Sequence, residues 1–276
     1  MAERATSRRV PVLIMTGDKL RHRYFANRIL SRLPDGLMLV ERQPEAPWGS
    51  HDAAPTPLIR RHFDDFHAQE IASFSATVDA AGHFLTDRTF IEIAAGAIND
   101  EDVIRRVVGL DPEMIVVLST SLIRDSFIRA FSGRMINFHA GLSPYYRGTG
   151  TNVFPFYNRE LEYVGVTIHH VDPGIDSGNI LLHGRPQWEA EDNTHTIGCK
   201  NVAVAADLVL RIVEHARRAG PPPAHPQDLG HGRVYYKKDF TDAVVRRIYE
   251  NIAAGMVRDY AAAGPRPVAL IESLAR

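Results

Sequence analysis

Short apolar runs that alternate with helix-length amphipathic segments constrain the fold of this chain most strongly. The predicted strands are residues 10–15, 37–40, 90–93, 114–118 and 134–138. The predicted helices are residues 19–33, 58–81, 99–108 and 122–131, and the proline-rich stretch 44–57 is a predicted loop. This alternation predicts an α/β fold with a Rossmann-like, mostly parallel sheet and helices on both faces.

The second half of the chain has a different pattern. Its predicted elements are two neighbouring strands at 163–171 and 179–185, a long helix at 194–219, a strand at 234–236 and a helix at 241–262. The loop between the two neighbouring strands carries Asp176. We predict one α/β domain over residues 1–225, followed by a short C-terminal extension, a strand plus a helix, over 226–276.

The charge balance gives no bulk attraction for polyanions. The chain has 32 Lys and Arg residues against 33 Asp and Glu, a formal net charge of −1, so we expect neither a nucleic acid nor a membrane as partner. Its first residues contain only a short apolar run, and its single cysteine, Cys199, fits a reducing compartment. We therefore expect a cytoplasmic protein.

Three polar side chains point to chemistry at the carboxyl edge of the sheet. Asn137 and His139 end a predicted strand with a spacing of two, so both face the same side. A carboxamide and an imidazole placed together suit the stabilisation of an oxyanion, and the imidazole also moves protons near neutral pH. Asp176 lies between Gly174 and Gly178, a loop that lets its carboxylate approach a substrate closely.

These residues belong to a longer pattern. It consists of Asn137-x-His139, Pro144, Arg147-Gly148, Gly165-Val-Thr-x-His169 and Asp172-x-Gly-Ile-Asp-x-Gly178. The pattern resembles the folate-dependent formyltransferase family, which includes methionyl-tRNA, glycinamide ribonucleotide and sugar N-formyltransferases and formyltetrahydrofolate hydrolase. The resemblance covers about residues 10–217 and is most specific over 136–180. It implies a Rossmann-like catalytic domain that uses N10-formyltetrahydrofolate as co-substrate.

The resemblance also implies roles for single residues. Asn137 and His139 would stabilise the oxyanion, while Asp176 would keep His139 protonated and help, through water, to take the proton of the amine. The folate would be held by the family loop at residues 118–123 and the loop before Asp176, and the candidates are Ser121, Leu122, Ile123, Asp172 and Gly174.

Candidate acceptor-binding residues lie near the first predicted turn and in the family motif. They are Thr16, Asp18, Lys19, Arg21, Arg147 and His169. Lys19 and Arg21 would bind a phosphate or carboxylate with help from the helix N-terminus, although a solvated helix face is an alternative for these basic residues. No metal is expected, since the adjacent His169 and His170 face opposite sides of a strand.

The sequence therefore predicts an N-formyltransferase that acts on a primary amine of a small metabolite, either an amino sugar nucleotide or an amine derived from an amino acid. The extension of about 50 residues is too short for the full C-terminal domain of methionyl-tRNA formyltransferases. That activity, a formyltetrahydrofolate hydrolase and a non-catalytic folate-binding protein are the alternatives. An apolar stripe in the extension fits either a homodimer interface or a cover for its own domain, and it consists of Ile248, Ile252, Met256 and Tyr260.

Overall fold

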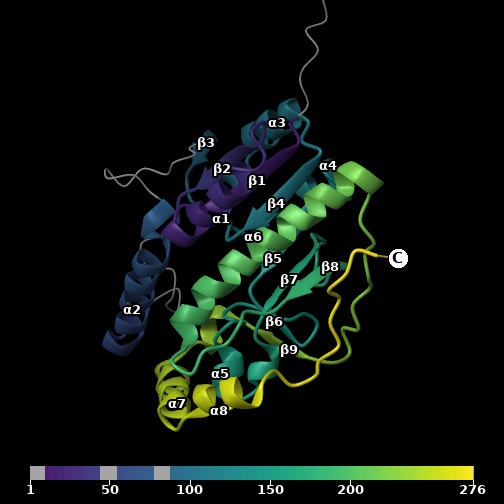
Figure 1. Cartoon of the computed structure of the whole chain (residues 1–276). Coiled ribbons are helices and arrows are strands. Elements are labelled where there is room, and N and C mark those ends of the chain that lie inside the picture. The colour runs from purple at the N-terminus through teal and green to yellow at the C-terminus, as the bar shows by residue number, and fades with distance from the viewer. Residues whose placement is uncertain (1–9, 44–54, 78–87, 276) are drawn as a thin grey trace, which may run out of the picture.

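A seven-stranded sheet forms the centre of the protein, as Figure 1 shows. The computed structural model describes residues 10–43, 55–77 and 88–275. The strands are β1 (Val12–Gly17), β2 (Leu37–Glu41), β3 (Thr89–Ile93), β4 (Met114–Leu118), β5 (Met135–His139), β7 (Val166–His170) and β8 (Ile180–Gly184), in the order β3-β2-β1-β4-β5-β7-β8. The first five are parallel, whereas β7 is antiparallel to both β5 and β8. The predicted mostly parallel sheet is confirmed.

Helices cover both faces of this sheet. They are α1 (Leu20–Leu30), α3 (Glu101–Leu110), α4 (Asp125–Ala130) and α6 (Thr194–Ala219), while α2 (Pro57–Phe74) packs on α1 and α6 beside the sheet. Along β1, Val12 and Ile14 pack into the core shared with α1 and α6, which crosses the front of the sheet in Figure 1. Leu13 and Met15 point the other way, into the core shared with α3 and α4. This alternation along a buried strand gives the sheet its two apolar faces.

The long helix α6 matches the predicted range, and its start has a clear cause. The Asn193 side chain accepts hydrogen bonds from the amides of His195 (2.8 Å) and Thr196 (3.2 Å). Thr196 Oγ1 accepts in return from the Asn193 amide (2.9 Å), which completes a capping box. By contrast, α2 ends at Phe74 and a 3-10 turn follows at Ser75–Thr77, so the α-helix is shorter than the predicted 58–81. The last predicted residues, 78–81, lie outside the described residues. The same holds for most of the predicted loop at 44–57.

The C-terminal extension differs from the prediction in its helix. In place of one helix over 241–262, the structure has α7 (Asp242–Ala253) and α8 (Met256–Ala263). Gly255 separates them with a φ of +87°, a conformation that favours glycine and ends α7. Its strand is β9 (Arg233–Tyr235), which pairs in parallel with β6 (Tyr146–Gly148) in a separate two-stranded sheet.

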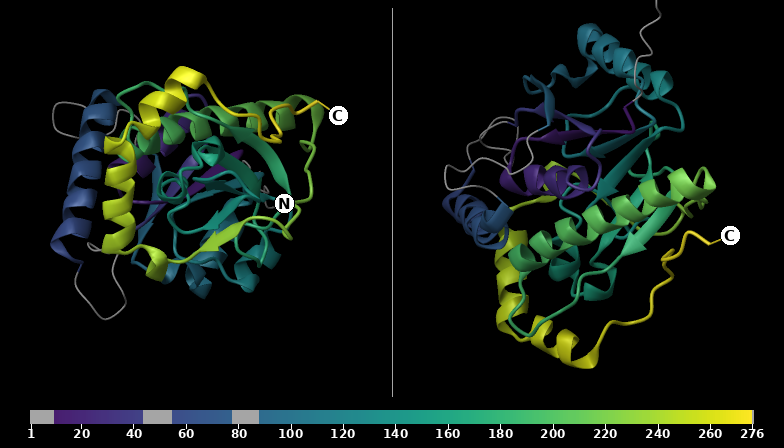
Figure 2. Two further views of the ribbon diagram at one scale, coloured as in Figure 1. Left: turned by 90° about the horizontal axis from the view of Figure 1, so that it is seen from below. Right: turned by 45° about the horizontal axis from the view of Figure 1, so that its top comes forward.

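The extension packs on its own chain. Ile248, Met256 and Tyr260 are buried in a second apolar core together with residues of α5 (Phe154–Asn158), and Ile252 packs against it. Figure 2 shows α7 beside α2 at one end of the molecule. Of the two interpretations of the apolar stripe, the cover for its own domain is confirmed, and the stripe gives no support for a homodimer.

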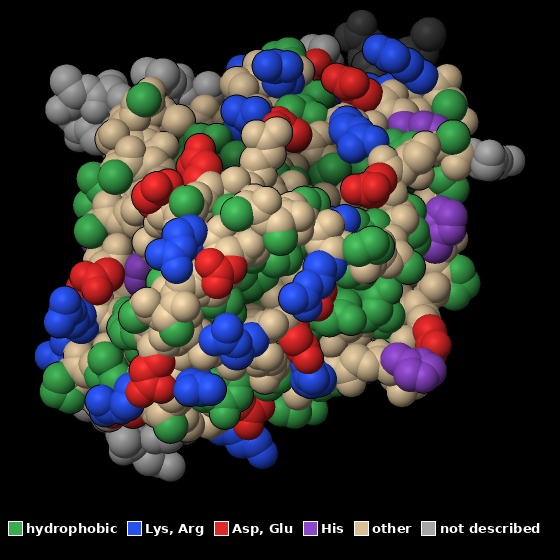
Figure 3. Space-filling model, turned by 60° about the horizontal axis from the view of Figure 1, so that its bottom comes forward, with side chains coloured by type: hydrophobic (Ala, Val, Ile, Leu, Met, Phe, Trp, Pro, Cys, Tyr) green, Lys and Arg blue, Asp and Glu red, His purple; other side chains and the backbone are tan. Residues whose placement is uncertain are grey.

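Charges of both signs are mixed over the face shown in Figure 3, where Lys and Arg side chains alternate with Asp and Glu. Among the residues that the structure describes, no helix combines the length and the apolar character needed to cross a membrane.

A buried histidine ties the C-terminal tail to the sheet. His183 in β8 donates from Nε2 to the carbonyl of Ser143 (2.8 Å), and its Nδ1 accepts from the amide of Ile271 (2.9 Å). Both partners are satisfied only by the neutral ring, because a second proton would point at the Ile271 N–H. Burial is the main cause that lowers the pKa of His183, to about 4.

This histidine is expected to make the fold sensitive to acid. Since its pKa is lower in the folded than in the unfolded chain, the unfolded chain binds the proton first as the pH falls, and stability is lost between about pH 6.5 and about pH 4. The contribution is about 1.4 kcal/mol per pH unit. Urea unfolding at about pH 7 and about pH 5 should give a smaller pH dependence for His183→Gln than for the wild type. The exposed His231→Gln serves as control, and an equal pH dependence in all three proteins would contradict the assignment.

Candidate functional site

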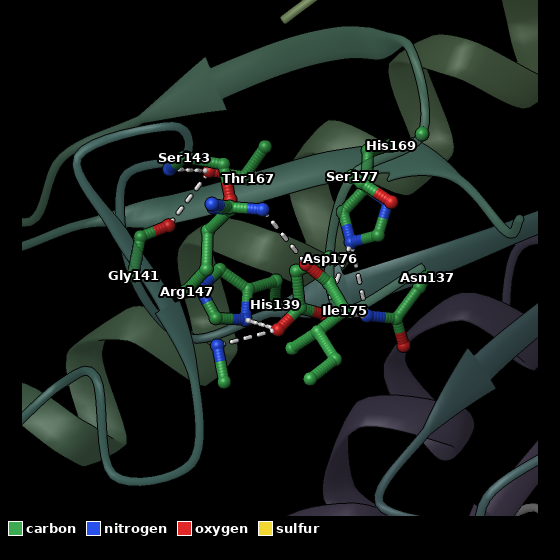
Figure 4. A network of polar contacts seen from close by, with 12 residues as sticks. Asn137, His139, Gly141, Ser143, Arg147, Thr167, His169, Ile175, Asp176 and Ser177 are labelled. Carbon is green, nitrogen blue, oxygen red and sulfur yellow. Dashed lines mark hydrogen bonds and ion pairs between the residues drawn. The ribbon is translucent and has the colours of Figure 1, made fainter. Parts of the chain in front are cut away.

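The predicted catalytic residues meet at the junction of the parallel and antiparallel parts of the sheet. Asn137 and His139 lie on β5, and the register with the antiparallel β7 places Asn137 directly opposite His169. Asp176 comes from the loop between β7 and β8. As Figure 4 shows, Asn137, His139 and His169 all point toward the Asp176 carboxylate. The predicted shared side of Asn137 and His139 is therefore observed.

Asp176 is the hub of this cluster. Its Oδ2 lies 3.2 Å from Nδ1 of His139 and accepts the Gly148 amide at 2.8 Å. Its Oδ1 lies 3.4 Å from Nε2 of His169 and accepts from Nδ2 of Asn137 at 3.4 Å. The backbone of Asp176 has a φ of +46°, which aspartate tolerates better than most residues. The loop is thus shaped to bring one carboxylate against four nitrogen atoms, of which the Gly148 amide and the Asn137 carboxamide are donors in every protonation state.

These contacts keep the carboxylate ionised. Burial alone would raise the pKa of Asp176, but His139, His169 and the Gly148 amide outweigh it and hold the pKa below its usual range. The side chain is nevertheless 17% exposed. The site therefore contains a negative charge at neutral pH that water can reach.

His139 is held between two acceptors. Its Nδ1 faces Asp176, and its Nε2 donates to the backbone carbonyl of Tyr146 at 2.8 Å. Only the protonated ring satisfies both acceptors at once. Burial acts in the opposite direction and lowers the pKa of His139 more than Asp176 raises it. Negative charge that develops on a substrate beside this ring would shift the balance back toward the protonated form.

A cavity of about 840 Å³ opens beside this cluster. All of the predicted folate contacts line it, namely Ser121, Leu122, Ile123, Asp172 and Gly174, and so do the predicted acceptor contacts Lys19, Arg21 and His169. The cluster, the predicted folate contacts and half of the predicted acceptor contacts therefore share a single space.

The loop that carries Ser121 is held in place by hydrogen bonds from its backbone to two side chains, those of Glu41 and Asn99. The buried carboxylate of Glu41 accepts the amides of Gly96 (2.8 Å) and Ser121 (2.5 Å). Asn99 donates to the carbonyl of Leu122 (2.9 Å) and accepts the Arg124 amide (2.7 Å). The Ser121 amide is thus committed within the protein, which restricts its predicted folate contact to other atoms.

Three predicted acceptor contacts are not part of the cavity lining. Thr16 is fully buried within β1, and Asp18 has a carboxylate oxygen buried in the turn that follows. Arg147 points its guanidinium at the carbonyl of Ile175 (3.4 Å). Arg147 therefore supports the loop that carries Asp176, and the acceptor contacts predicted for these three residues stay predictions.

The sequence reasoning missed one entire wall of the cavity. It is mostly aromatic and is built by α2, the first turn of α6 and the extension: His62, Phe63, Phe66, His195, Tyr235, Tyr236 and Phe240. The rings contact one another, with 4.5 Å between the ring centres of His62 and His195 and 5.7 Å between those of Phe63 and Phe240. Helical spacing predicted α2, but it gave no sign that this face of α2 meets the extension.

The aromatic wall carries little charge. Burial, followed by the neighbouring His195, lowers the pKa of His62 to about 3, and burial also lowers the pKa of His195. Both rings are therefore neutral near pH 7. The cationic side chains that line the cavity are Lys19, Arg21 and Lys237, and Arg21 pairs with Glu70.

The sequence is similar to known proteins over about half of its length. The family model described as formyl transferase matches residues 69–212, just over half of the chain. Methionyl-tRNA formyltransferase of Thermodesulfovibrio yellowstonii is 32% identical over 120 residues, 43% of this chain and 39% of that protein. GDP-perosamine N-formyltransferase of Brucella melitensis is 31% identical over 125 residues, 45% of this chain and 47% of that protein. The matches thus span less than half the length of these relatives.

Solved structures show the same fold. The N-formyltransferase of Helicobacter canadensis, in complex with folinic acid and dTDP-3-aminofucose, superimposes with a TM-score of 0.52 at 16% identity. The superposition covers 88% of this chain and 80% of that one. At this level of identity the similarity establishes the shared architecture.

Proposed function

Because this chain belongs to the formyl transferase family, we propose that it transfers the formyl group of N10-formyltetrahydrofolate to a primary amine of a small metabolite. The observation that carries the proposal is the cluster of Asn137, His139 and His169 around the ionised Asp176, at the wall of the large cavity. An amide, an imidazole and a carboxylate in contact supply hydrogen-bond donors for an oxyanion and an acceptor for a proton.

The residues along one side of the cavity fit a folate. Glu41 and Asn99 fix the loop of Ser121–Arg124, while the amides of Leu122 and Ile123 have no hydrogen-bond partner among the described residues. The Leu122 side chain lines the cavity and is 85% exposed, so it offers apolar surface to a flat ring. N10-formyltetrahydrofolate would supply an activated formyl group at this place. The relative from Helicobacter canadensis, crystallised with folinic acid, supports the assignment.

The chemistry follows from the positions of the polar atoms. Asn137 would donate to the formyl oxygen as it gains negative charge, and His139, kept in place by the Tyr146 carbonyl, would supply positive charge beside the same oxygen in its protonated form. Asp176 would hold His139 in place. Since the Asp176 carboxylate is ionised and reachable by water, it would also accept, through water, the proton that the attacking amine loses. The bond between the formyl carbon and N10 would then break as the new carbon–nitrogen bond is kept, and the same proton would pass on to N10, so that tetrahydrofolate leaves as a neutral amine.

The aromatic wall and the two lysines beside it favour an acceptor that carries both a ring and a negative charge. Neutral imidazoles and phenyl rings stack on a nucleobase or cover the apolar face of a sugar, whereas Lys19 and Lys237 provide positive charge for a phosphate. Lys19 precedes α1, whose first turn has no acidic residue, and a helix N-terminus attracts anions. We therefore propose a nucleotide-linked amino sugar as acceptor, in line with the sugar formyltransferases among the relatives.

The experiment that tests this function is a spectroscopic assay of tetrahydrofolate release from N10-formyltetrahydrofolate. It would be run in water alone and with amino sugar nucleotides, amino acids and methionyl-tRNA, for the wild type and His139→Ala. Release that requires an amino sugar nucleotide and is lost in the variant is expected. Release in water alone would indicate a hydrolase, release with methionyl-tRNA would indicate a tRNA enzyme, and no release with any acceptor would overturn the proposal.

Glu41→Gln is expected to weaken folate binding selectively. Glutamine presents one oxygen and one NH₂ group, so one of the two amides held by Glu41 loses its acceptor, at a cost of about 1–3 kcal/mol. We expect the KM for N10-formyltetrahydrofolate to rise about tenfold, with kcat changed less than about twofold. Glu92→Gln removes a half-exposed partner of Arg23 and is the control. An unchanged KM in Glu41→Gln would show that the loop does not hold the folate.

A further inference from the structure

Strand β6 holds two of the reacting groups with its backbone. The Tyr146 carbonyl accepts from Nε2 of His139 (2.8 Å), and the Gly148 amide donates to Oδ2 of Asp176 (2.8 Å). A shift of this three-residue strand would therefore move the imidazole and the carboxylate together.

The extension holds β6 from its other side. β9 pairs with β6 in the register Tyr146–Arg233 to Gly148–Tyr235. The Arg233 amide donates to the carbonyl of Tyr145 (2.8 Å), and the Thr149 amide donates to the carbonyl of Tyr235 (2.8 Å). β6 therefore lies between the reacting centre and a strand that comes from the end of the chain.

Side chains reinforce this pairing. The Arg233 guanidinium donates from Nη1 to the Tyr146 hydroxyl (2.8 Å) and from Nη2 to Oε1 of Glu160 (3.0 Å), and Tyr146 also donates to Glu160. Asn158 donates to the hydroxyls of both Tyr146 and Tyr235 (2.8 Å each). Since Tyr146 is 1% exposed, its ring is held on all sides and fixes the carbonyl that contacts His139.

A second contact from the extension reaches Asp176 itself. Nε2 of Gln227 donates to the backbone carbonyls of Asp176 (2.9 Å) and Gly178 (2.6 Å). The left-handed backbone at Asp176 is thus held on one side by Gln227, while Gly148 holds its carboxylate on the other.

From these two sets of contacts we infer that the extension is part of the catalytic machinery, with Arg233 and Gln227 as positioning residues for His139 and Asp176. The inference rests on the proposed formyl transfer for its kinetic consequences, but not for its structural ones. Neither side chain belongs to the cavity lining, so they would act on the rate through alignment and leave the binding of both substrates largely unchanged.

The test compares Arg233→Met and Gln227→Leu with the wild type, and Arg247→Met as matched control. Arg247 lies in the same extension and pairs with Glu250 on the exposed face of α7. Each positioning variant is expected to lower kcat about tenfold to a hundredfold while both KM values change less than about threefold. Arg247→Met should keep the kcat of the wild type.

Amide hydrogen exchange measures the alignment without turnover. The Gly148 amide should exchange at least about tenfold faster in both positioning variants, whereas the Ile115 amide, hydrogen-bonded to Arg134 in the sheet, stays protected and shows that the fold is intact. Unchanged Gly148 exchange in both variants would overturn the inference, whatever kcat does. A fall in kcat with unchanged Gly148 exchange would thus also contradict the inference, because Arg233 and Gln227 would then affect the rate without holding β6 and Asp176 in place. If the wild type released no tetrahydrofolate at all, the proposed function would fail, and the exchange data would still decide the coupling.

Discussion

Replacing Asp176 with asparagine is expected to lower kcat about a thousandfold or more, while the chain stays folded. Asparagine fills the same volume but carries no charge, and its NH₂ group would face one of the donors that now meet a carboxylate. The groups around the carboxylate include the Gly148 amide, which donates in every state, and the rings of His139 and His169, which donate to it when protonated. The substitution therefore removes the proton acceptor and disturbs the orientation of both imidazoles.

The measurement is kcat by tetrahydrofolate release, with folate affinity measured separately by equilibrium binding. Asp228→Asn is the matched control, because Asp228 also pairs with a histidine, His231, at 2.9 Å, but on the exposed surface. A loss below about tenfold in Asp176→Asn, with folate affinity unchanged, would remove Asp176 from the reaction and leave it a structural role in the loop.

Gly148→Ala is expected to be strongly destabilising, because it strikes the pairing of β6 with β9. The φ of Gly148 is +91°, and a Cβ at this position would lie 2.1 Å from the carbonyl oxygen of Tyr235. An alanine would thus meet backbone strain and a collision with backbone that cannot rotate away, so β6 and β9 would separate. We expect a loss of about 3–5 kcal/mol in the free energy of unfolding, with activity lost together with the Gly148 contact to Asp176.

Gly133→Ala separates the two causes. Gly133 also has a positive φ, +76°, but a Cβ there would meet nothing within 4 Å. That variant should lose only the strain, about 1–2 kcal/mol. Urea unfolding measures the free energy of unfolding of both variants. An equal loss in the two would show that β9 moves away from a Cβ at Gly148 without a further loss of stability.

The parallel strands were readable from the sequence because they are buried on both faces. The predicted strand 114–118 agrees residue for residue with β4, whose central residues Ile115 and Val116 are fully buried. A strand in that environment is an unbroken apolar run bounded by polar residues, which has few other interpretations. α6 was equally readable, because its apolar residues recur at helical spacing over 26 residues and an asparagine caps its start. Few structures other than a long helix fit that pattern.

The polar cluster around Asp176 was readable for a different reason. Asn137 and His139 are polar residues at the end of an otherwise apolar strand, and Asp176 lies among glycines in a short loop. Because side chains alternate between the two faces of a strand, Asn137 and His139, two positions apart, had to lie on the same face. The contribution of Glu41 was hidden, because a single acidic residue at the end of β2 looks like the start of a loop, although its side chain is fully buried.

The role of the extension could not be read from the sequence. β6 has only three residues, Tyr146–Gly148, too few for an alternating pattern, and its partner β9 is 85 or more positions later in the chain. Pairing of such short strands depends on tertiary contacts, which leave no local signature. The break between α7 and α8 did have a signal, Gly255, but a glycine within a helical pattern ends a helix only where the packing requires the left-handed turn.

The register between β5 and β7 makes the site sensitive to the length of the chain as well as to the identity of its residues. Asn137 faces His169 across the two strands, and neighbouring side chains on β7 point to opposite faces. Deleting one residue at the start of β7 would place His170 opposite Asn137. Each side chain of the strand would then point to the face opposite its present one. The same chemical groups would then remain in the sequence but no longer meet. Within the stretch from Val166 to Gly184, a change in length is therefore expected to disrupt the site even where every functional side chain is kept.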